Sequence, residues 1–332
     1  MRAVAAVALS GRYAVFGRQA AAGLRAWAGL AGADLVLEDD GSVPGRTAEI
    51  VDRLAPGADI VFGPYGSGAG RAVAERMAGR PEVIWNHGAA ALGPGPRRAR
   101  VVDVLAPAPA YWRGLGETLA AVEPGARALV ARGPGGYAAE IAAGAVASLE
   151  AVGSPAPLAD LDPADPAAAL QAARDAGATW VTGGGRADDD LALARELAPA
   201  GLAAALPVCG VTLAAEALGD AVRGWIGPSQ WLPGTSAPPA PLPADADFPA
   251  AQALAAGLLA QEALRRAGSA DPDRLWDAAR ALRTTTFFGP FAVDAEGRQT
   301  AHAPLLVRWT GSGAGLRREV VWAPGGPQQL SG

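Results

Sequence analysis

The sequence predicts an α/β protein with parallel, doubly wound sheets. Short apolar runs that end in glycine, proline or serine alternate with segments of helical spacing, which is the pattern of strands and helices in turn. The pattern restarts after the prolines at positions 107 and 109, so two α/β units of similar size are expected. A length of 332 residues also suits two domains.

The first unit begins with an apolar run at 3–9, a strand closed by Ser10 and Gly11. Helical spacing of Leu24, Trp27 and Leu30 predicts a helix after it. The expected strands here are 3–9, 34–38, 60–62, 83–85 and 101–105. The expected helices are 19–30, 44–54, where a proline stands in the first turn, and 67–78.

The second unit repeats this order. Helices are expected at 112–122, 137–151, 165–176 and 188–197, and strands at 128–131, 180–182, 208–210 and 224–228. The proline-rich segment 233–243 is a linker. Two helices, 248–267 and 272–282, and two strands, 287–293 and 304–309, follow it. Short connections between alternating elements are typical of a parallel sheet.

Composition excludes several classes of protein. The net charge is −5, which argues against a nucleic-acid protein, because phosphate binding needs a basic face. All 28 basic residues are arginine, so neither a Schiff-base lysine nor a P-loop lysine is present. The single cysteine, Cys209, excludes an internal disulfide, and with only His87 and His302 beside it a structural zinc site is not expected. We expect no metal and no cofactor.

The start of the chain leaves the compartment open. Met1 and Arg2 before an apolar stretch resemble a truncated signal peptide, but we interpret residues 3–9 as the first strand. A periplasmic or cell-surface location is expected if a signal peptide was removed, and a cytoplasmic one if Met1 is the native start. No apolar run approaches the roughly 18–20 residues that span a bilayer.

Aromatic residues gather where the loops follow the predicted strands. Ligands of parallel α/β sheets bind outside the carboxyl ends of the strands. A tyrosine offers a small molecule both an apolar face and a polar tip. The side chains chosen as candidate ligand contacts are Tyr13, Phe16, Tyr65, Trp85 and Tyr137. Ordinary packing at the loop bases is the alternative for any one of them.

Two loops of the first unit carry further candidates. Gly66 and Ser67 end one strand and open a helix, and we expect Ser67 to be the N-cap, with free N–H groups behind it for a carboxylate or phosphate. Capping alone is the competing explanation of Ser67. The loop 85–90 follows the next strand, where His87 and its neighbour Asn86 are possible donors, although a lone histidine also suits loop packing.

Signals of an enzyme are poor. The glycine-rich turns 133–136 and 183–185 do not match a dinucleotide fingerprint, and no nucleophile elbow is present. The carboxylates at 188–190 stand at a predicted helix start, where negative residues stabilise the helix dipole, so we interpret them as caps. No catalytic residue is predicted. A nicotinamide-dependent or hydrolytic α/β enzyme is the rival hypothesis from another class.

Several ordered motifs resemble the type I periplasmic binding proteins, and more closely their leucine/isoleucine/valine-binding branch. The similar segments are 9–23, 38–40, 60–67 and 288–309, in the family's order. The resemblance implies two Rossmann-like lobes joined by three crossover segments, with a ligand cleft between them that closes like a hinged trap. Lobe 1 would hold 1–107 and 233–288, and lobe 2 would hold 108–232 and 289–332.

The resemblance also implies roles for single residues. Ser67 matches a serine that binds the ligand carboxylate, and Tyr137 an aromatic residue of the second lobe. Thr212 lies where amino-acid binders often carry an acid for the ammonium group, so an α-amino acid ligand is not favoured. The loop containing Gly88, Ala89 and Ala90 matches a second carboxylate-binding loop, here without a hydroxyl. The turn containing Gly185 and Arg186 would close from lobe 2.

These expectations combine into one functional hypothesis. The chain is a solute-binding protein, not an enzyme, that captures a small amide, aromatic or carboxylated ligand for an ABC permease. An amino-acid ligand is the alternative cargo. A cytoplasmic amide-type sensor that regulates transcription is the alternative function.

Overall fold

The chain passes three times between two units of structure. The computed structural model describes residues 1–93 and 95–326. The first unit comprises Met1–Pro107 and Gln230–His302, and the second comprises Ala108–Ser229 and the residues from Ala303 onward. This division agrees with the predicted α/β fold of two lobes connected by three crossovers.

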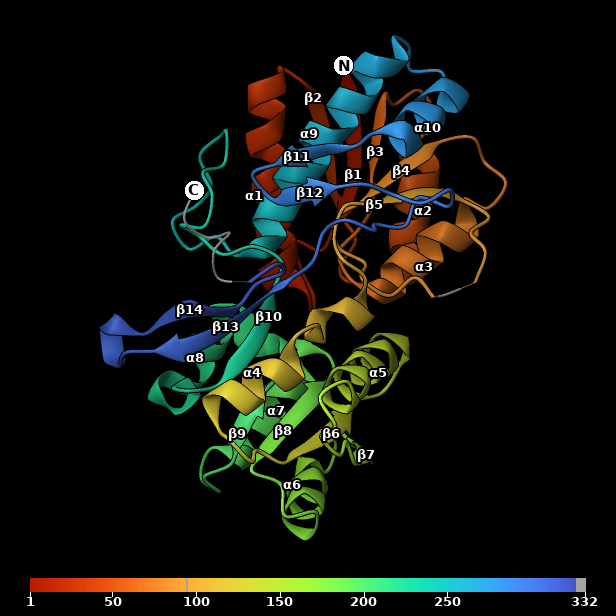
Figure 1. The fold of residues 1–332 in the computed structure, drawn as a ribbon. Helices are drawn as coiled ribbons and strands as arrows, with labels where there is room; N and C mark the ends of the chain where they lie inside the picture. Colours follow the sequence, from red (N-terminus) through yellow and green to blue (C-terminus); the bar gives the residue numbers. More distant parts are fainter. Residues whose placement is uncertain (94, 327–332) are drawn as a thin grey trace. The chain divides into compact units, whose positions relative to one another are not determined.

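The first unit is built on a parallel sheet with the strand order β2-β1-β3-β4-β5 (Figure 1). Its strands are β1 (Arg2–Val7), β2 (Asp34–Asp39), β3 (Ile60–Phe62), β4 (Val83–Asn86) and β5 (Arg100–Asp103). The register pairs Ala3 with Leu35 on one side and with Ile60 on the other. An antiparallel pair, β11 (Thr284–Thr286) and β12 (Gly289–Phe291), belongs to the same unit.

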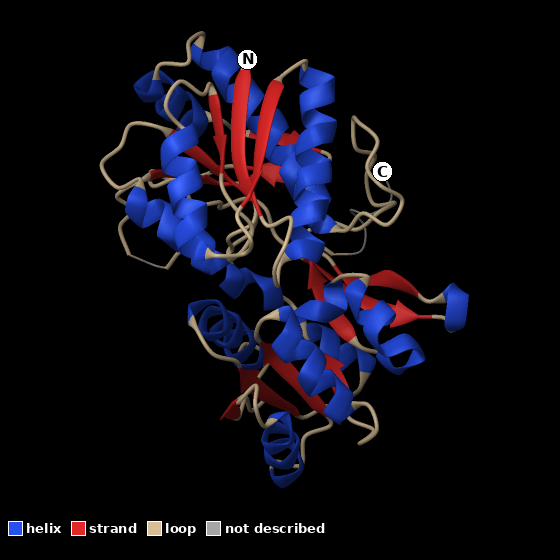
Figure 2. Cartoon of the chain, turned by 180° about the vertical axis from the view of Figure 1, so that it is seen from behind, coloured by secondary structure: helices blue, strands red, loops and turns tan. Residues whose placement is uncertain are grey.

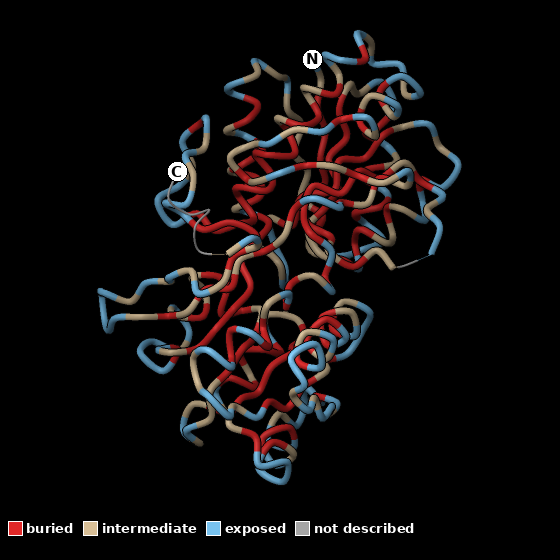
Figure 3. Tube along the Cα trace, viewed as in Figure 1, coloured by how far each residue is buried: buried red, intermediate tan, exposed pale blue. Residues whose placement is uncertain are grey.

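Helices cover both faces of this sheet (Figure 2). They are α1 (Ala14–Ala31), α2 (Pro44–Leu54), α3 (Ser67–Arg76), α9 (Phe248–Ala267) and α10 (Pro272–Ala281). Apolar side chains of α2 and α3 pack on Val4, Val61 and Ile84 of one face. Helix α1 packs against α9, and the strands between the layers are buried (Figure 3).

The contact between α1 and α9 depends on a small residue. A Cβ atom at Gly23 would lie 2.0 Å from the carbonyl oxygen of Ala250, which no side chain tolerates. The two helices therefore approach each other at this glycine, which joins segments that are more than 200 residues apart in the sequence. At its other end α9 stops at Gly268, whose φ of 63° is the left-handed conformation that closes helices.

The second unit contains a mixed sheet with the strand order β14-β13-β10-β9-β8-β6-β7. Its strands are β6 (Ala128–Arg132), β7 (Leu158–Asp160), β8 (Trp180–Gly184), β9 (Ala203–Ala205), β10 (Ile226–Ser229), β13 (Leu305–Thr310) and β14 (Arg317–Trp322). Its helices are η1 (Ala108–Trp112), α4 (Leu115–Val122), α5 (Gly136–Glu150), α6 (Pro166–Asp175), α7 (Ala187–Leu197), η2 (Pro207–Gly210), α8 (Leu213–Leu218), η3 (Gly219–Val222) and η4 (Gly313–Gly315). Strands β13 and β14 are antiparallel additions to a parallel core.

Some predicted elements of the second unit are wrong. Residues 208–210 form part of the 3-10 helix η2, because Pro207 cannot donate to a sheet, and the strand is instead the alanine run β9. The helix expected at 112–122 is split at Gly114, whose φ of 81° interrupts helical geometry. Strands β7 and β14 and helix α8 of this unit were not expected, nor was β11 in the first unit.

Two lobe boundaries differ from the predicted ones. The sequence hypothesis ends the first lobe at 288, whereas the first unit continues to His302. Two contacts hold the extra residues there: β12 pairs with β11, and the Gln299 Nε2 atom donates to the carbonyl oxygen of Val104 across 3.1 Å. The crossover expected at 232 falls at Ser229 and Gln230. No helix among the described residues is long and apolar enough to cross a membrane.

Candidate functional site

An aromatic cluster forms at the carboxyl ends of β1 and β3 in the first unit. The rings of Phe16 and Tyr65 are stacked with centroids 5.1 Å apart, and Tyr13 lies 6.2 Å from Tyr65. Gly66 completes the group, since a Cβ atom there would lie 3.4 Å from the Tyr13 ring. Tyr13 and Tyr65 are only half-buried. The structure therefore brings four of the predicted site residues together at this edge of the sheet.

Ser67 is not the N-cap that the sequence suggested. Gly66, with a φ of 97°, occupies the cap position, and Ser67 is the first residue of α3. The Ser67 Oγ atom instead accepts a hydrogen bond from the backbone N–H of Ala91 at 3.0 Å. The N-cap makes no side-chain hydrogen bond, so α3 starts with N–H groups that no cap occupies.

Asn86 shapes the loop that follows β4. Its Oδ1 atom accepts from the N–H groups of Gly88 and Ala89, at 3.2 and 2.9 Å. Its Nδ2 atom donates to the Ala89 carbonyl and to the Asp103 carboxylate, at 2.8 and 2.7 Å. The sequence predicted Asn86 as a possible ligand donor, but its side-chain oxygen and nitrogen are already hydrogen-bonded to this loop and to Asp103. An asparagine at a strand end, whose side chain can accept from the backbone two residues on, is the signal for such a turn.

Two predicted residues of this loop are buried instead of exposed. Trp85 is fully buried within β4, and only 1% of the His87 surface is exposed. Burial lowers the pKa of His87 to about 4, because a charged imidazole would lose its hydration there. His87 is therefore neutral at physiological pH. Ala90 is half-buried, so it is more accessible than its neighbour Ala89.

The start of α3 provides what an anion needs. The leading N–H groups of a helix carry partial positive charge and have no partner within the helix. Gly68, in this first turn, is exposed. With the half-buried tyrosines beside Gly66, this end of the first unit offers donors for a carboxylate or amide and an aromatic surface for an apolar body.

The second unit carries a smaller group of predicted residues. Tyr137 is the second residue of α5 and makes an edge contact with Tyr111, with ring centroids 6.3 Å apart. The turn with Gly185 and Arg186 follows β8 and lies against the loop before Tyr137, since a Cβ atom at Gly133 would be 2.9 Å from the Gly185 Cα atom. Thr212 stands immediately before α8.

The carboxylates at the start of α7 have two different roles. Asp189 caps the helix as predicted and forms an ion pair with Arg186 at 2.8 Å. Asp190, also interpreted as a cap, is fully buried and accepts from the N–H groups of Gly185 and Val208, at 2.7 and 3.2 Å. Its burial raises the pKa of this carboxyl well above the usual value. Asp190 therefore joins the loops that follow β8 and β9, a role that sequence reasoning missed.

The described residues were searched for metal-binding clusters and for a reactive thiol. No group of three histidine, cysteine, aspartate or glutamate side chains that could hold a metal ion occurs among them. Cys209 is buried, and burial raises the pKa of its thiol, which makes a poor nucleophile.

Comparison with known proteins places the chain in a family. The family model described as periplasmic binding protein matches residues 3–314, and the chain belongs to this family. It is a family of binding proteins, not of enzymes, as the sequence predicted. A comparison with curated protein sequences gives no match.

Solved structures of binding proteins share the fold. A leucine-binding protein from Thermotoga maritima is 17% identical with a TM-score of 0.82, covering 96% of this chain and 97% of that one. A solute-binding protein of an ABC transporter from R. palustris, in complex with benzoate, is 17% identical with a TM-score of 0.77, and 96% of each chain is covered. Another from R. palustris, with 4-hydroxybenzoate, is 17% identical with a TM-score of 0.79, over 96% and 95%. These likenesses confirm the predicted fold.

Proposed function

We propose that this protein is the solute-binding component of an ABC importer and that its cargo is a small organic acid or amide. The observation that carries the proposal is the start of α3, where no side chain caps the helix and the Tyr13, Phe16 and Tyr65 rings lie beside Gly66. A carboxylate or amide oxygen accepts from the helix N–H groups, and the rings contact the apolar body.

The cargo lacks a free α-ammonium group. A buried ammonium needs a counter-charge, because its desolvation is expensive. Thr212 is a hydroxyl where amino-acid binders often carry an acid, and Asp189 and Asp190 are already engaged by Arg186 and by backbone N–H groups. The benzoate and 4-hydroxybenzoate complexes of similar fold support an aromatic acid, whereas the leucine-binding relative represents the competing cargo.

A calorimetric titration series separates these cargoes. The series contains leucine, 4-methylpentanoate, which is leucine without its amino group, benzoate and benzamide. We expect benzoate or 4-methylpentanoate to bind at least tenfold more tightly than leucine, a difference of about 1.4 kcal/mol or more. Tighter binding of leucine than of 4-methylpentanoate would show that the pocket holds an ammonium group and would overturn the assignment of cargo.

A matched pair of variants tests the site. Tyr65→Ala removes the ring that contacts both Phe16 and Tyr13, and it should weaken binding of the best acid roughly tenfold. Tyr65→Phe keeps the ring and should retain most of the affinity. Equal affinity of Tyr65→Ala and the parent protein would place the cargo elsewhere.

A further inference from the structure

A pocket lies in the second unit, and none of the residues that line it is a predicted ligand residue. Its volume is about 370 Å³. Trp180 is the first residue of β8, Ala203 the first of β9, and Trp225 directly precedes β10, so the pocket lies at the amino ends of these strands. Gly185 and Arg186 follow β8 at its opposite end. The pocket is lined by Val122, Glu123, Trp180, Ala198, Gly201, Leu202, Ala203, Ala221, Arg223, Gly224, Trp225 and Arg308.

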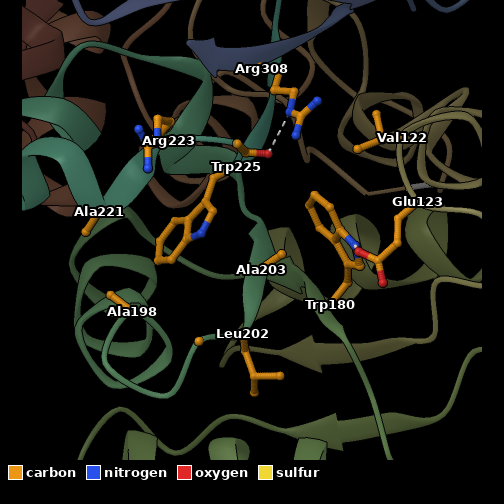
Figure 4. Close-up of a pocket in the computed structure, with 12 residues that line it drawn as sticks. Val122, Glu123, Trp180, Ala198, Leu202, Ala203, Ala221, Arg223, Trp225 and Arg308 are labelled. Atoms are coloured by element: carbon orange, nitrogen blue, oxygen red, sulfur yellow. Dashed lines mark hydrogen bonds between the residues drawn. The ribbon is translucent and has the colours of Figure 1, made fainter. Parts of the chain in front are cut away.

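Two tryptophan side chains contribute to the lining of this pocket. Figure 4 shows the rings of Trp225 and Trp180 on either side of Ala203. The Trp180 Nε1 atom donates to the Glu123 Oε2 atom across 2.8 Å, which holds both side chains in place. Although both tryptophans line the pocket, they are at least 95% buried, so their orientations are fixed by packing. The parts of these fixed indoles that are open to a ligand are small, 2% of Trp180 and 5% of Trp225.

Positive charge exceeds negative charge in the pocket. Arg223 and Arg308 line it together with a single acid, Glu123. The Arg308 Nε atom donates to the Gly224 carbonyl oxygen at 3.1 Å, drawn as a dashed line in Figure 4. Within residues 1–93 and 95–326, neither arginine forms an ion pair with a carboxylate. This excess occurs in a chain whose net charge is −5, so it is local to the pocket.

We propose that this pocket is a second binding site, distinct from the cargo site, for a planar organic acid that also carries a hydrogen-bond donor. The carboxylate of the ligand pairs with Arg223 and Arg308, whose guanidinium groups favour such anions. The ring contacts the small exposed parts of Trp180 and Trp225, and the donor on the ring reaches the Glu123 carboxylate. A volume of about 370 Å³ is in the usual range of small-molecule sites and accommodates a one-ring acid.

Nuclear magnetic resonance of the indole N–H groups tests the site directly in the full chain. The chain has nine tryptophans, and Trp180→Phe and Trp225→Phe assign the two signals that matter. The probe is 4-aminobenzoate, with aniline as the analogue that lacks the acid. We expect 4-aminobenzoate to shift both signals in a saturable manner and aniline to bind roughly tenfold more weakly.

Charge-reversal variants separate a built site from unspecific contact. Arg223→Glu, at an exposed lining residue, should weaken 4-aminobenzoate binding roughly tenfold, whereas Arg174→Glu, the same change on exposed α6 outside the pocket, should not. The proposal is overturned if the two signals do not shift at about 10 mM probe, roughly the weakest affinity of interest. It is also overturned if both variants bind equally well.

A further variant distinguishes the proposed second site from the cargo site. Gly68→Glu places a negative charge at the start of α3, in the first unit. The shifts of Trp180 and Trp225 should persist in this variant even if cargo binding is lost. If they disappear together with cargo binding, the two sites are one and the second site does not exist.

Discussion

The hydroxyl of Ser67 accepts a hydrogen bond from the backbone N–H of Ala91 at 3.0 Å, and both residues are buried. This bond links the first residue of α3 to the loop that follows β4. The start of α3 and the loop that follows β4 are thereby held together at the carboxyl edge of the first sheet. The bond to Ala91 uses the Ser67 hydroxyl as an acceptor, and its O–H remains a donor for the proposed cargo.

Removal of that hydroxyl should therefore affect stability. Ser67→Ala leaves the Ala91 N–H without its partner in a buried position, and we expect the free energy of unfolding to fall by about 1–3 kcal/mol. Ser67→Thr retains the acceptor and should recover most of the loss. Denaturant titration measures both variants. An unchanged unfolding free energy for Ser67→Ala would mean that water replaces the serine.

A charge placed at the start of α3 should act on stability and on binding in opposite directions. Gly68→Glu adds a carboxylate near the helix N-terminus, which stabilises the helix by about 0.3–1 kcal/mol but repels an anionic cargo. Gly68 has room for a side chain, since the nearest atom to its Cβ position is 3.8 Å away. We expect a higher melting temperature together with at least tenfold weaker binding of benzoate or 4-methylpentanoate.

Gly45→Glu is the matched control, because Gly45 stands in the first turn of α2 with no atom within 4 Å of its Cβ position. It should stabilise the protein and leave cargo binding intact. Equal affinities of the two variants would remove the start of α3 from the binding site.

Two glycines of α1 should respond to alanine with opposite signs. Gly23→Ala drives a methyl group into the Ala250 carbonyl at 2.0 Å and should cost about 1–3 kcal/mol by forcing α1 away from α9. Gly29→Ala meets no atom within 4 Å and should stabilise the helix by about 0.5–1 kcal/mol. Thermal and denaturant unfolding measure both. A neutral Gly23→Ala would show that the helices separate without cost.

Acid should weaken the first unit through its two histidines. Burial lowers the pKa of both His87 and His302 from 6.5 to about 4. The folded state then binds fewer protons than the unfolded state, so stability is full above about pH 6.5 and is lost as the pH falls toward 4. Each histidine contributes a slope of up to about 1.4 kcal/mol per pH unit.

Since the chain has only these two histidines, the pH dependence can be assigned by substitution. His87→Gln and His302→Gln should each remove part of the slope between pH 6.5 and 5, whatever they do to stability at pH 7. Unfolding free energies measured across this interval test the effect. Parent and variants with the same slope would show that neither histidine is the titrating group.

Local patterns were sufficient for most of the fold. The helices α2 and α9 begin and end at the predicted residues, Pro44–Leu54 and Phe248–Ala267. The failures have physical causes. Alanine-only β9 has no large apolar or β-branched side chain to signal a strand. The edge strand β14 alternates exposed and half-buried residues and carries three charges, so it has no buried face that would predict it.

The location of the candidate site could be predicted from the sequence, but most of its hydrogen bonds could not. The rule that ligands bind at the carboxyl ends of parallel strands located Tyr13, Tyr65 and Gly66 correctly beside one another. The sequence did not reveal that Ser67 bonds Ala91 or that Asp190 joins two loops. Both bonds depend on loops that tertiary structure brings together, which no spacing along the chain encodes.

The packing of α1 on α9 has a consequence for the synthesis of this protein. Residues 14–31 leave the ribosome early, while their partner at 248–267 is translated more than 200 residues later. The first unit thus cannot complete its core while the second unit is being made. Until α9 is translated, the face of the nascent sheet that carries α1 lacks this helix. A nascent chain of this design is exposed to aggregation for longer than one whose domains are contiguous, and chaperone protection during translation is expected to matter most over that interval.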